Sequence, residues 1–221
     1  MKRLLVLRPQ PGASATVAKA RERGLDPIVV PLFEIQPVVW QAPEPPSFDG
    51  LLLTSANAVR HAGEGLHALR DLKVYAVGDV TAEAAREAGF DVAAAGEAGV
   101  DRLLGSIGPE LKLLHLCGAD RTAPKQARQA ITPLVVYRSI PLPAPDLSSA
   151  VAGVVLVHSP RAGARLAELV RDRGSVTVAA ISGAAADAVG SGWRVVEAAK
   201  HPNDDALLAL AARLCNNSPP Q

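Results

Sequence analysis

The sequence has 221 residues, of which 48% are hydrophobic and 20% charged, so it can bury a sizeable core and is not a disordered chain. Its 23 basic and 22 acidic side chains give a net charge of +1, which argues against a general nucleic-acid binder, because such a protein needs a basic face. Two cysteines, Cys117 and Cys215, form neither a disulfide framework nor a CxxC motif. The apolar run near the start ends at Arg8-Pro9, too short for a signal peptide, and no run reaches the roughly 20 apolar residues of a membrane span. We therefore expect a cytoplasmic protein with no membrane partner.

Short apolar runs alternate with segments of helical period along the whole chain. Expected strands, mostly continuous Val, Leu, Ile and Ala runs of the kind covered on both faces of a parallel sheet, are 3–8, 27–31, 49–53, 73–77, 90–94, 111–116, 133–137, 153–157, 176–180 and 193–196. Expected helices are 12–23, 55–69, 79–88, 159–173, 182–190 and 203–214. This βα alternation predicts an α/β fold.

Two proline-rich segments, 34–46 and 137–145, interrupt this alternation. Proline removes a backbone donor and fits poorly in helices and central strands, so both segments are expected to be semi-rigid extended linkers. The tail 216–221 is expected to fray.

The chain contains two copies of one unit. The segment 51–58 aligns with 155–162, and 75–84 aligns with 178–187 to within one position. Ser55 precedes Gly78 by 23 residues, and Ser159 precedes Ser182 by the same 23. Residues 2–7 also resemble 111–116. The duplication predicts two similar lobes, although by itself it could be purely architectural.

Small polar residues follow the expected strands at corresponding places in both copies. In open parallel sheets ligands bind beyond the carboxyl ends of the strands, where helix N-termini present free N–H groups and a positive dipole end. Such ends could bind an anion with several carboxylates or phosphates. Ser, Thr and Asp are also ordinary N-caps, and for any single residue capping alone is the simpler interpretation. The candidates are Thr54, Ser55, Ala56, Asn57, Gly78, Thr81, Ser159, Arg161, Ser182 and Gly183.

Other chemistries lack their motifs. The sequence has no GxxxxGK[ST] phosphate loop, no GxGxxG after its first strand and no GxSxG nucleophile elbow. Its five histidines lack metal-ligand spacing, and Asp204-Asp205 is better read as a helix start than as a catalytic pair. We therefore expect no metal and no cofactor, and an activity that rests on binding and shaping the substrate.

The residues resemble the uroporphyrinogen-III synthase family over nearly the whole chain. The resemblance is carried by the order and spacing of several motifs: Arg8-Pro9, Pro31-Leu32-Phe33-Glu34-Ile35, Thr54-Ser55-Ala56-Asn57-Ala58-Val59, Val74-Tyr75-Ala76-Val77-Gly78 with Thr81-Ala82, Val136-Tyr137, His158-Ser159-Pro160-Arg161-Ala162 and Ala180-Ile181-Ser182. It implies two parallel-sheet lobes joined by a two-stranded linker. One lobe would be discontinuous, 1–36 with 142–221, the other would be 41–136, and the linkers would be 37–40 and 137–141.

The resemblance also implies an activity: cyclisation of hydroxymethylbilane, a linear tetrapyrrole with eight carboxylates, with loss of water and inversion of ring D. Tyr137 falls at the family's semi-essential tyrosine, which would donate a hydrogen bond or proton to the leaving hydroxyl, although it could simply pack at the hinge. Thr81 matches a family threonine near the substrate, and Ser55, Gly78, Ser159 and Ser182 match carboxylate-binding positions. Arg8 and Arg161 are plausible partners of carboxylates or, alternatively, members of surface ion pairs. The chain departs from the family at Ala184-Ala185, where threonines are common, which favours backbone contacts there.

Three alternatives stay open on the sequence alone. A non-catalytic two-lobed module for a small anion is the main one, although such solute-binding proteins usually carry an export signal. A flavodoxin-like or nucleotide-dependent regulator would need a phosphate loop, and a drifted family member would have a regulatory or fused role. The expected partners are the small-molecule substrate and, transiently, the hydroxymethylbilane synthase that hands it over. A monomer is the default.

Overall fold

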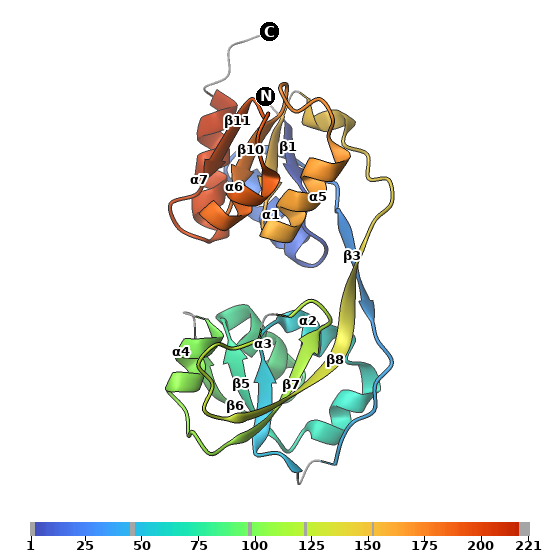
Figure 1. The fold of residues 1–221 in the computed structure, drawn as a ribbon, viewed down its shortest axis with the longest axis vertical. Helices are drawn as coiled ribbons and strands as arrows, with labels where there is room; N and C mark the ends of the chain where they lie inside the picture. Colours follow the sequence, from blue (N-terminus) through green and yellow to red (C-terminus); the bar gives the residue numbers. More distant parts are fainter. Residues whose placement is uncertain (1–2, 45–46, 97–98, 122, 152, 217–221) are drawn as a thin grey trace. The chain divides into compact units, whose positions relative to one another are not determined.

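All ten runs expected as strands form strands, and they assemble into two separate sheets. The computed structural model describes residues 3–44, 47–96, 99–121, 123–151 and 153–216. Of the tail 216–221, which was expected to fray, Asn216 is helical and the rest lies outside the described residues. Two compact units result: unit 1 is Met1–Glu34 with Pro141–Gln221, and unit 2 is Ile35–Ile140 (Figure 1).

Unit 1 holds a five-stranded sheet in the order β11-β10-β9-β1-β2, with every neighbouring pair parallel. Its strands are β1 (Arg3–Val6), β2 (Asp26–Val29), β9 (Val154–Val157), β10 (Thr177–Ala180) and β11 (Val195–Ala198). Its helices are α1 (Gly12–Glu22), η3 (Ser148–Ala150), α5 (Pro160–Leu169), α6 (Gly183–Val189) and α7 (Asp204–Asn216).

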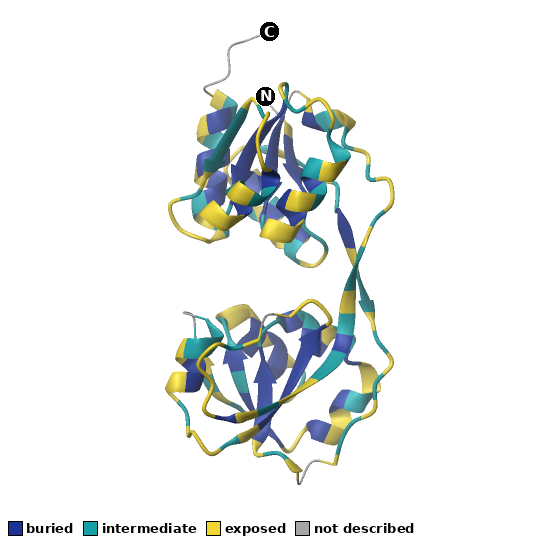
Figure 2. Cartoon of the chain, viewed as in Figure 1, coloured by how far each residue is buried: buried dark blue, intermediate teal, exposed yellow. Residues whose placement is uncertain are grey.

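Helices cover both faces of the unit 1 sheet. Successive side chains of a strand point to opposite faces, so neighbouring residues of one strand pack against different helices. Leu5 and Leu7 face the helices α5 and α6, whereas Leu4 and Val6 face α1 and α7. Figure 2 shows the central strands mostly buried, the edge strand β11 intermediate and the outer sides of these helices exposed. The central strands β1, β9 and β10 are therefore almost entirely apolar, which is the pattern that the sequence displays.

Unit 2 holds a six-stranded sheet in the order β3-β8-β7-β4-β5-β6, with β4 to β8 parallel. Its strands are β3 (Phe33–Pro37), β4 (Gly50–Leu53), β5 (Lys73–Val77), β6 (Val92–Gly96), β7 (Lys112–Gly118) and β8 (Ala130–Pro141). Its helices are α2 (Ala56–His61), the 3₁₀ helix η2 (Gly63–Leu69), α3 (Asp79–Glu87) and α4 (Val100–Gly105). The helices α2, η2 and α3 cover one face, and α4 covers the other.

The sequence predicted one helix over 55–69, but the structure divides this segment into α2 and η2. Gly63 has φ +67°, a left-handed conformation that favours glycine and ends the regular helix. The short helix α4 was not predicted from the sequence.

Both proline-rich segments contribute strands where the chain passes between the units. The first includes most of β3, and the second includes the end of β8, with Pro37 and Pro141 as the last residues of these two strands. The two strands are neighbours, and hydrogen bonds from Val38 N to Val136 O and from Leu142 N to Leu32 O, both 2.9 Å, lie near the ends of the pair.

The two units share one strand order, as the repeat predicts. β8, β7, β4, β5 and β6 of unit 2 follow each other as β2, β1, β9, β10 and β11 do in unit 1. One connection differs, because α1 joins β1 to β2, whereas residues 119–121 and 123–129, which lead from β7 to β8, contain no helix. The α/β class with two similar parallel-sheet lobes is confirmed.

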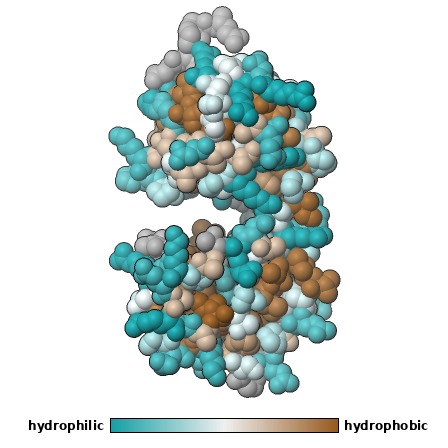
Figure 3. Space-filling model, viewed as in Figure 1, coloured by the Kyte–Doolittle hydropathy of each residue, from teal (hydrophilic) through white to brown (hydrophobic). Residues whose placement is uncertain are grey.

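The exposed large apolar side chains are few and separated along the chain: Val29, Val39, Val80 and Val151. Figure 3 shows hydrophilic and hydrophobic residues intermixed on the visible face of each unit. Among the described helices, none is long and apolar enough to cross a membrane.

Candidate functional site

Each sheet reverses its strand order at one point, and the candidate residues gather there. In unit 2 the chain builds β4, β5 and β6 in one direction and then returns to place β7 on the other side of β4. In unit 1 it places β2 on one side of β1 and β9 on the other. Ligands of open α/β sheets bind beyond the carboxyl ends of the strands at such switch points. The two candidate sites are therefore the β4/β7 end in unit 2 and the β1/β9 end in unit 1.

At the switch point of unit 2, Thr54 is held by a buried histidine. Thr54 directly follows β4, and its Oγ1 lies 3.0 Å from Nε2 of His115 on β7, which is 2% exposed. Burial, with a smaller contribution from the nearby charge of Arg121, lowers the pKa of His115 to about 4. His115 is therefore neutral near pH 7 and fixes the Thr54 hydroxyl by a hydrogen bond.

Tyr137 lies at the same end of the sheet. The pairing of β7 with β8 shifts between Cys117 and Gly118, so that Tyr137, not Val136, is the partner of Gly118. The main chain continues this pairing, since Ala119 N donates to Tyr137 O at 3.0 Å. The ring of His61, at the end of α2, has its centroid 6.3 Å from that of Tyr137. A half-buried phenol thus lies beside the switch point.

Gly78 and Thr81 begin α3, the helix that follows β5. Gly78 has φ +81°, so a side chain at this position would be strained. Thr81 is only 5% exposed, because it lies on the inner side of α3. Thr81 is therefore less open to a ligand than Thr54, Ser55 and Asn57, which are half-buried.

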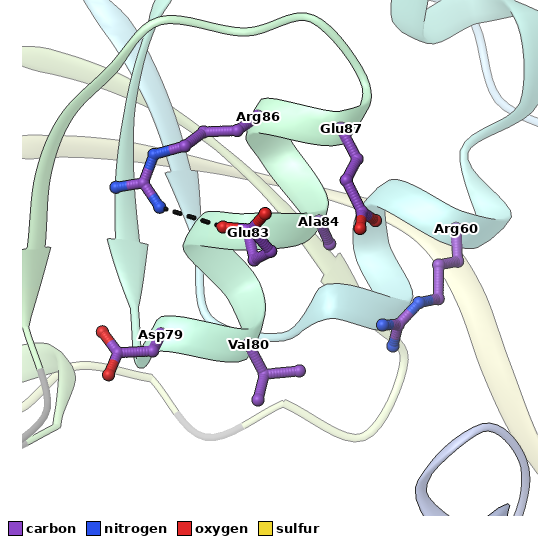
Figure 4. A pocket seen from close by; sticks show the side chains of 7 residues that line it. All are labelled: Arg60, Asp79, Val80, Glu83, Ala84, Arg86 and Glu87. Carbon is purple, nitrogen blue, oxygen red and sulfur yellow. Dashed lines mark hydrogen bonds and ion pairs between the residues drawn. The ribbon is translucent and has the colours of Figure 1, made fainter. Parts of the chain in front are cut away.

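A groove of about 520 Å³ runs between α2 and α3 in unit 2 (Figure 4). Arg60 enters it from α2, and α3 supplies the other lining residues: Asp79, Val80, Glu83, Ala84, Arg86 and Glu87. Arg86 pairs with Glu83 at 3.4 Å. The remaining charged lining residues are Arg60, Asp79 and Glu87, which together carry a net negative charge. The groove is therefore unfavourable for a ligand with several carboxylates.

At the switch point of unit 1, Arg8 is paired with Asp204. Nη1 of Arg8 lies 3.2 and 3.3 Å from the two carboxylate oxygens, and the hydroxyl of Thr16 donates to Oδ2 at 2.7 Å. Nε2 of His158, at the end of β9, lies 3.4 Å from Oδ1. Burial raises the pKa of Asp204, but His158, Thr16 and Arg8 outweigh it and lower the pKa to about 2. The carboxylate is therefore charged near pH 7 and tethers Arg8.

Replacing Asp204 by Asn is expected to destabilise unit 1 by about 2 kcal/mol near pH 7. This is the free energy that corresponds to a pKa lowered from 3.8 to about 2. A lowered carboxyl pKa stabilises the fold above pH 3.8, and this contribution disappears as the pH falls towards 2. Urea unfolding of both proteins between pH 7 and 2 measures it.

The neighbouring Asp205, whose ion pairs with Lys19 and Arg23 are exposed, provides the matched control. Asp205→Asn is expected to change stability little. Equal losses in the two variants would contradict the assignment of a structural tether to Asp204.

Serine hydroxyls cap three of the helices at these strand ends. Ser55 accepts a hydrogen bond from Asn57 N, Ser159 from Ala162 N, and Ser182 from Ala185 N, at 3.2, 3.2 and 3.3 Å. These hydroxyls are thereby engaged within the protein. A ligand at α2, α5 or α6 would meet the backbone N–H groups of the first turn that remain without an intrahelical acceptor.

Ser182→Ala is expected to lower stability by about 1 kcal/mol, the usual cost of removing an N-cap, while leaving KM nearly unchanged. Thermal unfolding and steady-state kinetics measure the two effects. Ser191→Ala, at an exposed position in the loop after α6, provides the control and should change neither. A large rise in KM with unchanged stability would instead indicate that the Ser182 hydroxyl contacts the substrate.

Arg161, in the first turn of α5, has its guanidinium carbon 4.5 Å from the centroid of the Phe33 ring. A cation over an aromatic face is attracted to it, so Phe33 helps to orient the exposed Arg161 side chain. Ala56 is buried at the start of α2, and Gly183 is exposed at the start of α6.

The structure brings Thr54, Ser55, Gly78 and Tyr137 to the strand ends of unit 2, and Arg8, Ser159, Arg161, Ser182 and Gly183 to those of unit 1. Sequence reasoning did not identify the contacts of His115 with Thr54 and of His158 with Asp204. His115 was noted on a strand, but only the pairing of β4 with β7 places it beside Thr54. The described residues contain no group of three or more His, Cys, Asp or Glu side chains that could hold a metal ion.

Comparison with known proteins agrees with this architecture. The family model described as Uroporphyrinogen-III synthase HemD matches residues 14–209. The fold is similar to that of the uroporphyrinogen-III synthetase of Helicobacter pylori, with a TM-score of 0.68 and 19% identity over 97% of this chain and 100% of that one. It is also similar to a mutant uroporphyrinogen III synthase of Thermus thermophilus, with a TM-score of 0.52 and 18% identity over 98% and 100%. No curated protein matches by sequence.

Proposed function

Because the chain belongs to the uroporphyrinogen-III synthase family, we propose how its own residues carry out that family's reaction. The protein is a cyclising hydro-lyase of haem biosynthesis. It converts hydroxymethylbilane to uroporphyrinogen III, with loss of water and inversion of ring D. The observation that carries this function is the family match over residues 14–209, which includes the whole β4/β7 switch point of unit 2 and, in unit 1, β9 but not β1 or Arg8.

Tyr137 is the proposed catalytic residue. Its hydroxyl donates a hydrogen bond, and then a proton, to the hydroxymethyl oxygen, so the C–O bond breaks and water leaves. The substituted α-carbon of ring D attacks the resulting azafulvene to give a spiro intermediate. Ring D then rearranges, the macrocycle closes, and the proton lost as the pyrrole is restored returns to the Tyr137 phenolate. The position of Tyr137 beside the β4/β7 switch point supports this role, because a donor there can reach a ligand beyond the strand ends.

The eight substrate carboxylates need cationic and N–H donors. We assign this task to Arg8 and Arg161 and to the strand-end residues Thr54, Ser55, Ala56, Asn57, Gly78, Thr81, Ser159, Ser182 and Gly183. The serine caps leave the backbone N–H groups as the principal donors at α5 and α6. Arg8 is already paired with Asp204, so it would offer a substrate only the guanidinium nitrogens that face away from that carboxylate.

The reaction proceeds without an enzyme to the I isomer, so positioning is the enzyme's principal contribution. Fresh hydroxymethylbilane, made by its own synthase, is mixed with this protein, oxidised, and resolved chromatographically into porphyrin isomers. A dominant III isomer is expected. A product mixture identical to that of the spontaneous reaction, from a protein shown to be folded, would contradict the function and favour a non-catalytic anion-binding module.

Several finer assignments belong to the same proposal. Residues 1–36 with 142–221 and residues 41–136 are the two lobes, and 37–40 with 137–141 link them. The enzyme is a cytoplasmic monomer that receives its substrate transiently from hydroxymethylbilane synthase and needs no nucleic acid. Sizing chromatography, cell fractionation and a test of substrate channelling with the synthase examine these points.

A further inference from the structure

We propose that Gly118 is a positioning residue for the reaction: the lack of a side chain at this position, together with the bulge opposite it, places the Tyr137 ring over the end of β7. The inference rests on the proposed function of Tyr137. It adds that Gly118 and the bulge orient the Tyr137 side chain.

The bulge determines which face of the sheet Tyr137 meets. Leu114 and Leu116 of β7 point into the core beneath α2 and α3, and so does Val136 of β8. Regular alternation would turn the residue after Val136 to the opposite face. The register shift at Cys117/Gly118 adds Val136 as an extra residue on β8, and Tyr137 packs against the same core. A bulge is a common means of re-aiming a side chain.

The ring occupies the place where a side chain of residue 118 would begin. A Cβ added to Gly118 would lie 2.7 Å from Cε2 and Cζ of Tyr137 and 2.9 Å from its hydroxyl oxygen, and these are its three nearest heavy atoms. Real Cβ atoms essentially never approach so closely, so any larger residue must displace the ring or the strand. Gly118 is not among the glycines with positive φ. The backbone therefore tolerates alanine, and the conflict is with Tyr137.

A purely structural interpretation also exists, because an aromatic ring across from a glycine can simply cover an exposed backbone. The chain contains such a pair for comparison. A Cβ added to Gly50, in the first position of β4, would lie 2.7 Å from Cε2 of Tyr75 and 2.7 Å from the carbonyl oxygen of Lys73. Gly50 is at the opposite end of β4 from Thr54, so this pair lies away from the strand ends that carry the candidate site.

The test compares Gly118→Ala with Gly50→Ala. Gly118→Ala is expected to lower kcat by about 100-fold, as much as Tyr137→Phe does, with little change in KM. The double variant Gly118→Ala/Tyr137→Phe is expected to lose no more, because two changes that remove one interaction are not additive. Gly50→Ala is expected to lower stability and to leave kcat unchanged.

The position of the ring is followed independently of activity. The chain has two tyrosines, so fluorotyrosine labelling gives two ¹⁹F signals, and Tyr75→Phe assigns them. Gly118→Ala should move the Tyr137 signal alone, and Gly50→Ala the Tyr75 signal alone. If Gly118→Ala does not fold, the ring-current shift of the Gly118 Hα protons, present in the unaltered enzyme and lost in Tyr137→Leu, reports the same contact.

The outcomes separate this inference from the proposed function. Unchanged kcat in folded Gly118→Ala, beside a strongly impaired Tyr137→Phe, overturns the positioning role alone, and so does a fully additive double variant. Unimpaired Tyr137→Phe overturns the catalytic role of Tyr137 and, with it, any catalytic consequence of Gly118. Absence of the ring-current shift in the unaltered enzyme would show that the ring does not cover Gly118.

Discussion

Replacing Tyr137 by phenylalanine is expected to lower kcat by about 100-fold while leaving KM nearly unchanged. The substitution removes one hydroxyl and retains the ring, which packs half-buried against the core of unit 2. A donor to the leaving hydroxyl acts most strongly as the C–O bond breaks, so its loss affects the chemical step more than binding. Initial rates of uroporphyrinogen III formation over a range of hydroxymethylbilane concentrations separate the two parameters.

Tyr75→Phe is the matched control, because Tyr75 is also half-buried but lies within β5, packed against the core beneath α4. It should leave both parameters unchanged. A Tyr137→Phe enzyme with normal kcat would exclude proton or hydrogen-bond donation by Tyr137. A raised KM with normal kcat would instead assign Tyr137 to substrate binding.

Acidification from pH 6.5 to pH 4 is expected to cost the folded protein about 3 kcal/mol through His115 alone. Burial, with a smaller effect of Arg121, lowers the pKa of this histidine to about 4 from a usual 6.5. Between these values the unfolded chain binds a proton that the folded chain does not, so stability falls as the pH falls. The contribution is fully present above pH 6.5. Urea unfolding measured at steps of pH tests it.

His115→Gln should remove most of this slope, because glutamine does not titrate and can still bond to Thr54. His61 contributes to the same window, since burial and then the charge of Arg60 lower its pKa, and His61→Gln measures that part separately. Asp204 affects the pH dependence of stability mainly below pH 3.8, so its contribution is separated from those of His115 and His61. A slope unaltered by His115→Gln would show that His115 is not the responsible group.

These two predictions concern the same end of one sheet. His115 fixes the hydroxyl of Thr54 at the end of β4, and Gly118 accommodates the ring of Tyr137 at the end of β7. Both devices depend on the pairing of neighbouring strands, β4 with β7 for His115 and β7 with β8 for Gly118. Protonation of His115 makes its Nε2 a donor, so below pH 4 the Thr54 hydroxyl would accept this hydrogen bond while unit 2 is destabilised.

The sequence alone was sufficient for the fold class and the repeat. Continuous apolar runs separated by helical segments predict parallel strands buried on both faces, because only such strands need apolar side chains at every position. The equal spacing from Ser55 to Gly78 and from Ser159 to Ser182 reflects two copies whose strand orders agree. The expected caps of α2, α5 and α6 also form, since an N-cap depends on residues within one turn. The assignment of site residues from the sequence stays a prediction.

Only the tertiary structure decided which strands are neighbours, and with that where each switch point lies. Local periodicity carries no information on strand order, so the sequence could not place His115 beside Thr54 or Asp204 beside Arg8. It also could not reveal the bulge that brings Tyr137 over Gly118, because a register shift is a property of two strands together. Local segments determine helices, strands and caps by themselves, whereas a site assembled across a sheet depends on pairing between distant segments.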